Sequence, residues 1–140
     1  MSPRAPEVMV RLSAEGSDRS YPIHIGPGLL TQGGLLRVLV GDRNVCLVTN
    51  ETVAPLFQSS VLDALHDNDA ASRRVTVVEL PDGEAHKTLV SYERILTAAL
   101  EDKHERSTLF IALGGGVIGD MTGFAAASFL RGADFIQVPT

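Results

Sequence analysis

The sequence has little cysteine, little lysine and no long hydrophobic run. It contains one cysteine, which excludes an intramolecular disulfide framework. No apolar run approaches the roughly 20 residues of a transmembrane helix, and the N-terminus has no apolar core of a secretory signal. Its Lys and Arg residues are scattered, and the net charge of −5 disfavours a nucleic-acid partner. These absences predict a cytoplasmic protein with neither a membrane nor a nucleic-acid partner.

What is present is typical of a globular domain. The chain has 140 residues, of which 44% are hydrophobic and 21% are charged. This length is enough for one domain with a sizeable core. Cys46 lies in an apolar run, so it is predicted to be a buried structural thiol and not a nucleophile.

The first part of the chain predicts an antiparallel hairpin. Residues 7–13 alternate between polar and apolar types, and a second extended run follows at 21–25. The residues between them are rich in Gly, Ser and Asp, as hairpin loops are. Residues 29–39 then suit a short helix interrupted by Gly33 and Gly34.

From residue 44 onward, short apolar runs alternate with helical segments. The predicted strands are 44–49, 75–80, 109–113 and 134–138, and the predicted helices are 51–66, 84–102 and 119–130. This alternation indicates a parallel sheet covered on both faces, with right-handed crossovers. The predicted fold class is therefore α/β, a Rossmann-like parallel sheet with flanking helices, preceded by an N-terminal antiparallel β-hairpin.

Three consecutive glycines, Gly114 to Gly116, stand between a predicted strand and a predicted helix. Glycines let the backbone turn tightly there and approach a ligand closely, and the helix N-terminus favours an anion such as a pyrophosphate. The G-x-G-x-x-G spacing is a weak signal, because it follows the third strand of the alternating series. A P-loop is excluded, since Asp120 and Met121 stand where Lys and Ser or Thr are required. A plain packing turn stays open as an alternative.

Two further strands are followed by polar residues. Asp82 and Gly83, which follow the strand that ends at residue 80, are typical of a turn. Glu84 and Lys87 suit the start of a helix with an ion pair on its surface. Residues 49–52 follow an earlier strand in the same way. The carboxyl ends of parallel strands meet at one edge of a sheet, where ligands bind. The three polar strand ends therefore predict one site, with Asp120 more suited to a ligand hydroxyl or amide than to a pyrophosphate.

Taken together, these segments resemble 3-dehydroquinate synthase. The resemblance is carried by residues 21–23, 47–52 and 81–87, and most strongly by the run 112–127 with its continuation 131–140. It implies an enzyme of the shikimate pathway that uses NAD and a divalent metal, Zn or Co. The implied substrate is the sugar phosphate 3-deoxy-D-arabino-heptulosonate 7-phosphate, and the implied products are 3-dehydroquinate and phosphate. NAD would be regenerated in each cycle, which makes the enzyme a lyase.

The resemblance also implies site residues. One Arg, Arg131, matches a substrate-binding position; read without the family, it would be a helix C-terminal cation before a glycine. The implied NAD-binding positions are Asn50, Thr52, Asp82, Gly83, Glu84, Ala85, His86, Lys87, Gly115, Gly116, Val117, Ile118, Gly119, Asp120 and Thr140.

The family continues beyond the position that matches Thr140, with a helical domain that supplies the metal ligands. Residues 1–140 are therefore expected to be a truncated N-terminal NAD-binding domain, with no metal ligand and no catalytic residue of its own. The fragment alone is expected to be inactive, and the full-length enzyme to be a homodimer. Two alternatives stay open. One is a related sugar-phosphate cyclase or metal-dependent polyol dehydrogenase, and the other is a non-catalytic nucleotide-binding module.

Overall fold

The computed structural model describes residues 6–14, 16–31, 34–66 and 73–140. Eight strands and four α-helices are assigned within these ranges, together with two 3-10 helices. In chain order they are β1 (Glu7–Val10), β2 (Ser13–Ala14), β3 (Ser17–Asp18), β4 (Tyr21–His24), α1 (Leu35–Val40), β5 (Val45–Asn50), α2 (Ala54–Leu65), β6 (Val75–Leu80), η1 (Glu84–His86), α3 (Leu89–Glu101), β7 (Leu109–Gly114), α4 (Gly116–Ser128), η2 (Phe129–Arg131) and β8 (Phe135–Pro139).

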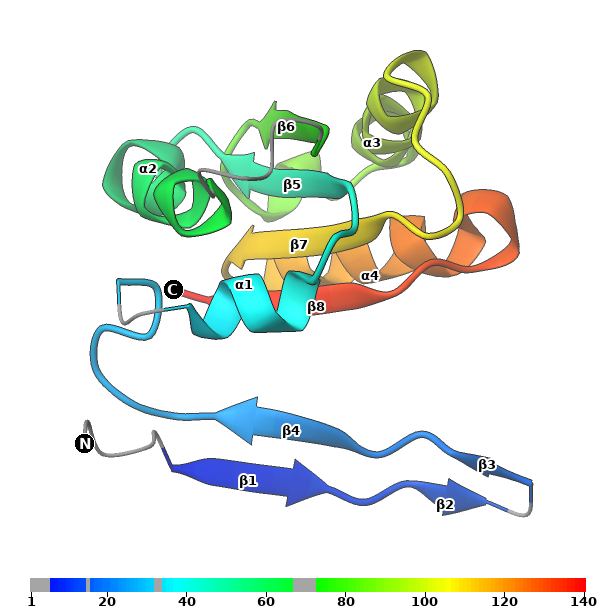
Figure 1. The fold of residues 1–140 in the computed structure, drawn as a ribbon. Helices are drawn as coiled ribbons and strands as arrows, with labels where there is room; N and C mark the ends of the chain where they lie inside the picture. Colours follow the sequence, from blue (N-terminus) through cyan, green and yellow to red (C-terminus); the bar gives the residue numbers. More distant parts are fainter. Residues whose placement is uncertain (1–5, 15, 32–33, 67–72) are drawn as a thin grey trace.

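The central sheet has four parallel strands in the order β6-β5-β7-β8 (Figure 1). The inner strands β5 and β7 are buried along their whole length, whereas β6 and β8 alternate between more and less exposed positions. This pattern follows from position, because inner strands are covered on both faces. The predicted parallel sheet is confirmed, and the predicted strand 75–80 coincides with β6.

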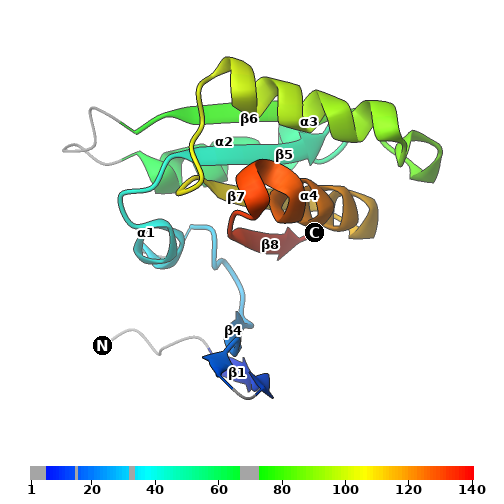
Figure 2. The ribbon, with the colours of Figure 1, turned by 90° about the vertical axis from the view of Figure 1, so that its right-hand side faces the viewer.

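Helices cover both faces of the sheet (Figure 2). On one face, α3 and α4 pack through residues such as Ile95, Met121 and Ala125 against Cys46 and Phe110. On the other face, α1 and α2 pack through their own buried residues against the alternate side chains of β5 and β7. Each face thus has its own hydrophobic core, and the two cores share the same two inner strands.

The helix boundaries differ from the sequence prediction in four places. The helix predicted at 119–130 already begins at Gly116. The helix predicted at 84–102 is divided into η1 and α3, because the Thr88 hydroxyl caps a new helix by accepting from the Ser91 amide. The one predicted at 51–66 begins at Ala54, and the one predicted at 29–39 covers only Leu35–Val40; Gly33 lies outside the described residues. Within the described ranges, every helix is too short or too polar to cross a bilayer.

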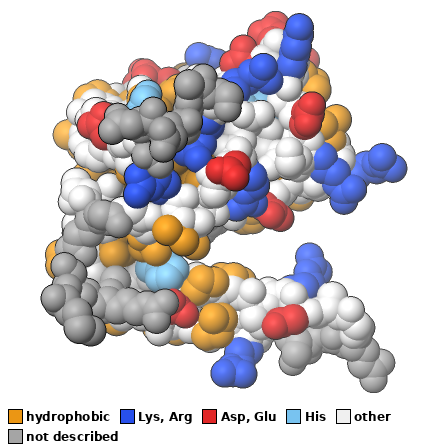
Figure 3. All heavy atoms as spheres, viewed as in Figure 1, with side chains coloured by type: hydrophobic (Ala, Val, Ile, Leu, Met, Phe, Trp, Pro, Cys, Tyr) orange, Lys and Arg blue, Asp and Glu red, His pale blue; other side chains and the backbone are white. Residues whose placement is uncertain are grey.

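The predicted N-terminal hairpin is confirmed. Strands β1 and β4 pair antiparallel from Glu7↔His24 to Val10↔Tyr21, and β2 and β3 continue the ribbon toward its turn. The ribbon stands away from the sheet, and the space-filling view shows an open hollow between the two, with hydrophobic side chains on both sides of it (Figure 3). Several apolar side chains of the ribbon are consequently exposed, Ile25 and Met9 among them.

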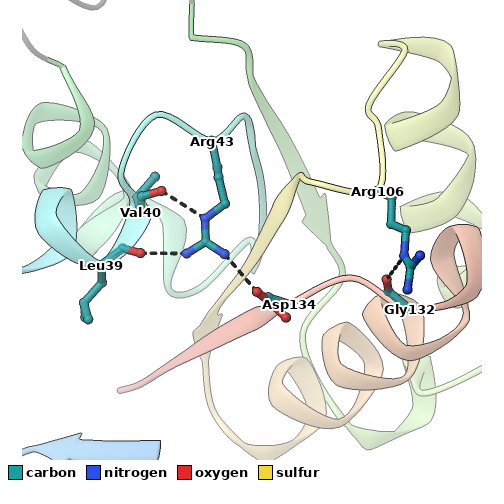
Figure 4. A network of polar contacts seen from close by, with 6 residues as sticks. All are labelled: Leu39, Val40, Arg43, Arg106, Gly132 and Asp134. Atoms are coloured by element: carbon teal, nitrogen blue, oxygen red, sulfur yellow. Dashed lines mark hydrogen bonds and ion pairs between the residues drawn. The ribbon is translucent and has the colours of Figure 1, made fainter.

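A polar network joins α1 to the start of β8 at the amino-terminal edge of the sheet (Figure 4). The guanidinium of Arg43 donates to the carbonyl oxygens of Val40 at 3.0 Å and Leu39 at 2.7 Å, and to the carboxylate of Asp134 at 3.0 Å. These bonds satisfy carbonyls at the end of α1 that have no partner within the helix. The network therefore stabilises the amino-terminal edge of the sheet, which lies opposite the carboxyl ends of β5 and β6.

Candidate functional site

The order of the strands defines where a ligand can enter. Along the chain the sheet grows outward from β5 to β6, and then in the opposite direction through β7 to β8. The direction therefore reverses between β5 and β7, and ligands of open α/β sheets bind at such a switch point, beyond the carboxyl ends of the strands. The polar ends of β5 and β6 and the glycine turn after β7 all lie at this edge, as the sequence predicts.

The glycine turn leads directly from β7 into α4. A Cβ on Gly114 would lie 3.0 Å from Cγ1 of Ile118, whereas a Cβ on Gly115 or Gly116 would meet nothing within 4 Å. No side chain caps the first amides of α4 within the described part of the chain, and these amides have no acceptor inside the helix. The turn thus presents free backbone donors in open space, which is the arrangement that receives a phosphate group.

The predicted site residues in α4 and after β8 differ in the groups that they can present to a ligand. The Ile118 side chain is 1% exposed and belongs to the core, so this residue can offer a ligand only its backbone. Gly119 lies against β8, where a Cβ would approach the Gln137 amide to 3.3 Å. Thr140 follows β8 and its amide donates to the Gly114 carbonyl at 3.3 Å. Val117 is half-buried.

Asn50 organises the end of β5. Its side-chain oxygen accepts from the amides of Thr52 at 3.1 Å and Val53 at 2.8 Å, and its side-chain nitrogen donates to Asp82 at 3.1 Å. Asn50 is 6% exposed. The buried amide therefore shapes the turn into α2 and joins the ends of two neighbouring strands.

Asp82 is held by the residues that follow β5. Its second carboxylate oxygen accepts from the Thr52 hydroxyl at 2.8 Å, and its own amide donates to the Glu51 carboxylate at 3.3 Å. The Asp82 carboxylate is thus fixed by neutral donors at the carboxyl end of β6. Thr49, one residue before Asn50, is fully buried, and its hydroxyl has no hydrogen-bond partner among the described residues.

Lys87 connects the loop after β6 to α4. Its ammonium group lies 2.8 Å from a carboxylate oxygen of Asp120 and 3.7 Å from one of Glu84. The hydrogen bond that Lys87 donates to the Asp120 carboxylate is the main cause that raises the pKa of Lys87. The predicted ion pair between Glu84 and Lys87 is thus present, but the shorter contact is with Asp120. Gly83, Ala85 and His86 are exposed in the same loop.

Arg131 is not brought together with these residues. It is exposed in η2, which follows the C-terminal end of α4, and its φ of 70° is left-handed. The glycine turn lies at the opposite end of that 13-residue helix, which spans roughly 20 Å at 1.5 Å per residue. A substrate-binding role for Arg131 stays a prediction.

No cluster of three or more His, Cys, Asp or Glu side chains that could hold a metal ion occurs in the described ranges. Cys46 is fully buried in the core, as predicted for a structural thiol. Burial, together with the charge of Asp102, raises the pKa of this thiol to about 12.

A parallel, doubly wound sheet with a glycine turn beside its switch point belongs to the Rossmann-like class of α/β domains. Residues 77–140 match the family model described as 3-dehydroquinate synthase N-terminal. The curated 3-dehydroquinate synthase of Pseudomonas fluorescens (strain SBW25) is 52% identical over 132 residues, which are 94% of this chain and 35% of the relative. The resemblance seen in the sequence is therefore confirmed, with the family model covering residues 77–140. The chain spans about a third of the relative's length.

Solved structures share the fold. A structure of 2-deoxy-scyllo-inosose synthase aligns with a TM-score of 0.73 at 22% identity, over 89% of this chain and 34% of that one. A second structure of an enzyme with this name, complexed with carbaglucose-6-phosphate, NAD⁺ and Co²⁺, has a TM-score of 0.65 at 22% identity, over 75% of this chain and 30% of that one. 2-Epi-5-epi-valiolone synthase from Streptomyces hygroscopicus subsp. jinggangensis 5008, with NAD⁺ and Zn²⁺ bound, has a TM-score of 0.69 at 22% identity, over 93% of this chain and 35% of that one.

Proposed function

We propose that residues 1–140 form the N-terminal NAD-binding domain of a 3-dehydroquinate synthase. The enzyme converts 3-deoxy-D-arabino-heptulosonate 7-phosphate to 3-dehydroquinate and phosphate, works in the cytoplasm and is a homodimer. The observation that carries this proposal is the uncapped N-terminus of α4 behind the open glycines at the switch point. The NAD⁺ bound in two structures that share the fold supports the choice of ligand.

The residues of the site fit a dinucleotide in two parts. Gly115 and Gly116 leave room for a diphosphate against the first amides of α4, whose dipole end favours negative charge. The ends of β5 and β6 offer carboxylate and hydroxyl oxygens, which suit the hydroxyls of a ribose. The groups concerned are Thr52, Asp82 and Glu84, with Asn50 holding Thr52 and Asp82 in place.

In the proposed reaction the chain's own residues bind and orient. Bound NAD would supply a hydride acceptor that is regenerated in each turnover. The glycine turn would fix the diphosphate, and the acidic groups at the ends of β5 and β6 would fix the ribose. This holds the cofactor in one position relative to a substrate, which is how proteins accelerate cofactor chemistry. Arg131 is proposed to bind the substrate, and a divalent metal, Zn or Co, to be held by residues outside 1–140.

The first test separates cofactor binding from turnover. The ¹⁵N-labelled 140-residue chain is titrated with NAD⁺ while the amide resonances of the glycine turn are followed by NMR. Phosphate release from 3-deoxy-D-arabino-heptulosonate 7-phosphate is measured with the same chain and with a longer protein that contains it. We expect NAD⁺ to shift the resonances of Gly115 and Gly116, and only the longer protein to release phosphate.

The alternatives give different results. Turnover by the 140-residue chain alone would contradict the division of the site between two domains. A longer protein that binds NAD⁺ but releases no phosphate would instead be a related sugar-phosphate cyclase or a polyol dehydrogenase. If NAD⁺ at millimolar concentration left all resonances of the glycine turn unchanged, the NAD site itself would be refuted.

A further inference from the structure

The proposed NAD site contains a carboxylate in a position where it works against the ligand. Asp120 lies four residues after Gly116 in α4. Side chains of a helix lean toward its N-terminus, and residues four apart are neighbours at about 6 Å. The Asp120 carboxylate therefore lies close to the amides that would receive the diphosphate. An unpaired negative charge there would repel both phosphate groups.

The structure places a single lysine against this carboxylate. Lys87 Nζ lies 2.8 Å from Asp120 Oδ2, while the second contact of the ammonium group, with Glu84, is longer at 3.7 Å. The Lys87 side chain is 38% exposed and that of Asp120 64%. A pair this exposed contributes little to folding stability, so the stability of the domain does not account for it.

We propose that Lys87 is a positioning residue that neutralises Asp120 and so makes the N-terminus of α4 able to receive an anion. The proposal rests on the proposed function, and it adds a role that differs from direct contact between Lys87 and the cofactor. In this arrangement Asp120 can present an oxygen to a neutral ligand group without repelling the diphosphate. The ion pair between Lys87 and Asp120 also connects the loop after β6 to α4.

The two roles of Lys87 are distinguished by a double-mutant cycle. If Lys87 contacts the cofactor directly, its removal weakens NAD⁺ binding equally whether residue 120 is Asp or Asn. If Lys87 acts by neutralising Asp120, its removal matters only while the carboxylate is present. Effects at independent sites combine additively, whereas coupled residues depart from additivity.

The variants Lys87→Met, Asp120→Asn and Lys87→Met/Asp120→Asn are titrated with NAD⁺ in the 140-residue chain. NMR detects binding at the glycine turn, and circular dichroism verifies that each variant is folded. We expect Lys87→Met to weaken binding about tenfold at low salt when Asp120 is present. With Asn at position 120 the same substitution should change binding by less than about twofold. The tenfold loss should shrink as salt is added, since salt screens exposed charges.

Two controls complete the design. Lys87→Arg preserves the charge and should restore the NAD⁺ binding that Lys87→Met loses. Lys103→Met removes the other lysine, which follows α3 and lies outside the loop after β6, and should have no effect. An equal loss from Lys87→Met in both backgrounds would overturn the inference and leave the NAD site standing. No binding by the unsubstituted chain would overturn the NAD site and the inference together.

Discussion

The side-chain nitrogen of Asn50 donates to the Asp82 carboxylate at 3.1 Å, and this bond joins the carboxyl ends of β5 and β6. The same Asn50 side chain accepts from the two amides that lead into α2. One buried amide thus sets both the spacing of two strand ends and the direction of the next helix. Several measurable consequences depend on contacts of this kind.

Substitution of Asn50 by Ala removes all three hydrogen bonds. We expect the free energy of unfolding to fall by about 2 kcal/mol, which is the upper part of the range for a lost capping residue. Urea denaturation followed by circular dichroism measures the change. Thr52→Val is the matched control, because it removes one bond to Asp82 and should cost about 1 kcal/mol. Equal stability of Asn50→Ala and the unsubstituted chain would contradict the structural role of Asn50.

The glycines of the turn should separate folding from binding. Gly114→Ala places a Cβ 3.0 Å from the Ile118 side chain, and we expect a loss of about 1–3 kcal/mol in the free energy of unfolding. Gly116→Ala meets nothing within 4 Å. That variant should be as stable as the unsubstituted chain and yet bind NAD⁺ more weakly, because the new methyl group would occupy the space proposed for the diphosphate. Thermal melts and NAD⁺ titration of both variants test this, and normal NAD⁺ binding by Gly116→Ala would contradict the site.

Stability should depend on pH through His104. This side chain is 4% exposed and lies 2.8 Å from the Thr76 hydroxyl, which also donates to Asp102. Burial, followed by the charge of Arg74, lowers the pKa of His104, and the charge of Asp102 opposes this shift. The unfolded chain therefore binds the proton more readily than the folded one. The stabilisation is complete above the unfolded pKa of about 6.5 and is lost as the pH falls below it.

Unfolding free energies at pH 7.5 and 5.5 measure this dependence. His104→Asn should reduce the difference between the two values, whereas His86→Gln, at an exposed position of η1, should leave it unchanged. If His104→Asn kept the full difference, the dependence would have to come from other groups.

The thiol of Cys46 should be inert in the folded chain. With a pKa of about 12 and no exposure to solvent, it forms almost no thiolate at pH 8. We expect no reaction with Ellman's reagent in buffer and one thiol per chain in 6 M guanidinium chloride. Rapid reaction of the native chain would show that the core between the sheet and α4 opens.

Local patterns predict β6 and the hairpin well, because both depend on neighbouring residues. The boundaries of β6 follow from its apolar run and the proline after it, and the hairpin follows from two alternating segments around a turn. The same local patterns do not predict that α4 begins at Gly116. Gly116 has a low intrinsic helix propensity, so its residue type does not predict a place inside the helix.

The site is predictable in its location but not in its contacts. That the strand ends meet at one edge follows from parallel topology alone. The pairing of Lys87 with Asp120 does not, since it depends on how the loop after β6 packs beside α4. The sequence offers a nearer partner, Glu84, which the structure places farther away. Asn50 is similar, because its bond to Asp82 connects residues that follow different strands.

The strand order also determines when the proposed cofactor site can exist during biosynthesis. Val45 of β5 pairs with Val75 on one side and, from much later in the chain, with Leu109 on the other. A ribosome delivers β5 and β6 well before β7, and pairings between distant segments are slow to form. The glycine turn follows β7, so the proposed site is incomplete until the inner strand β5 has both of its neighbours. A dinucleotide that binds at the proposed site would therefore stabilise the finished domain but could not guide the early steps of its folding.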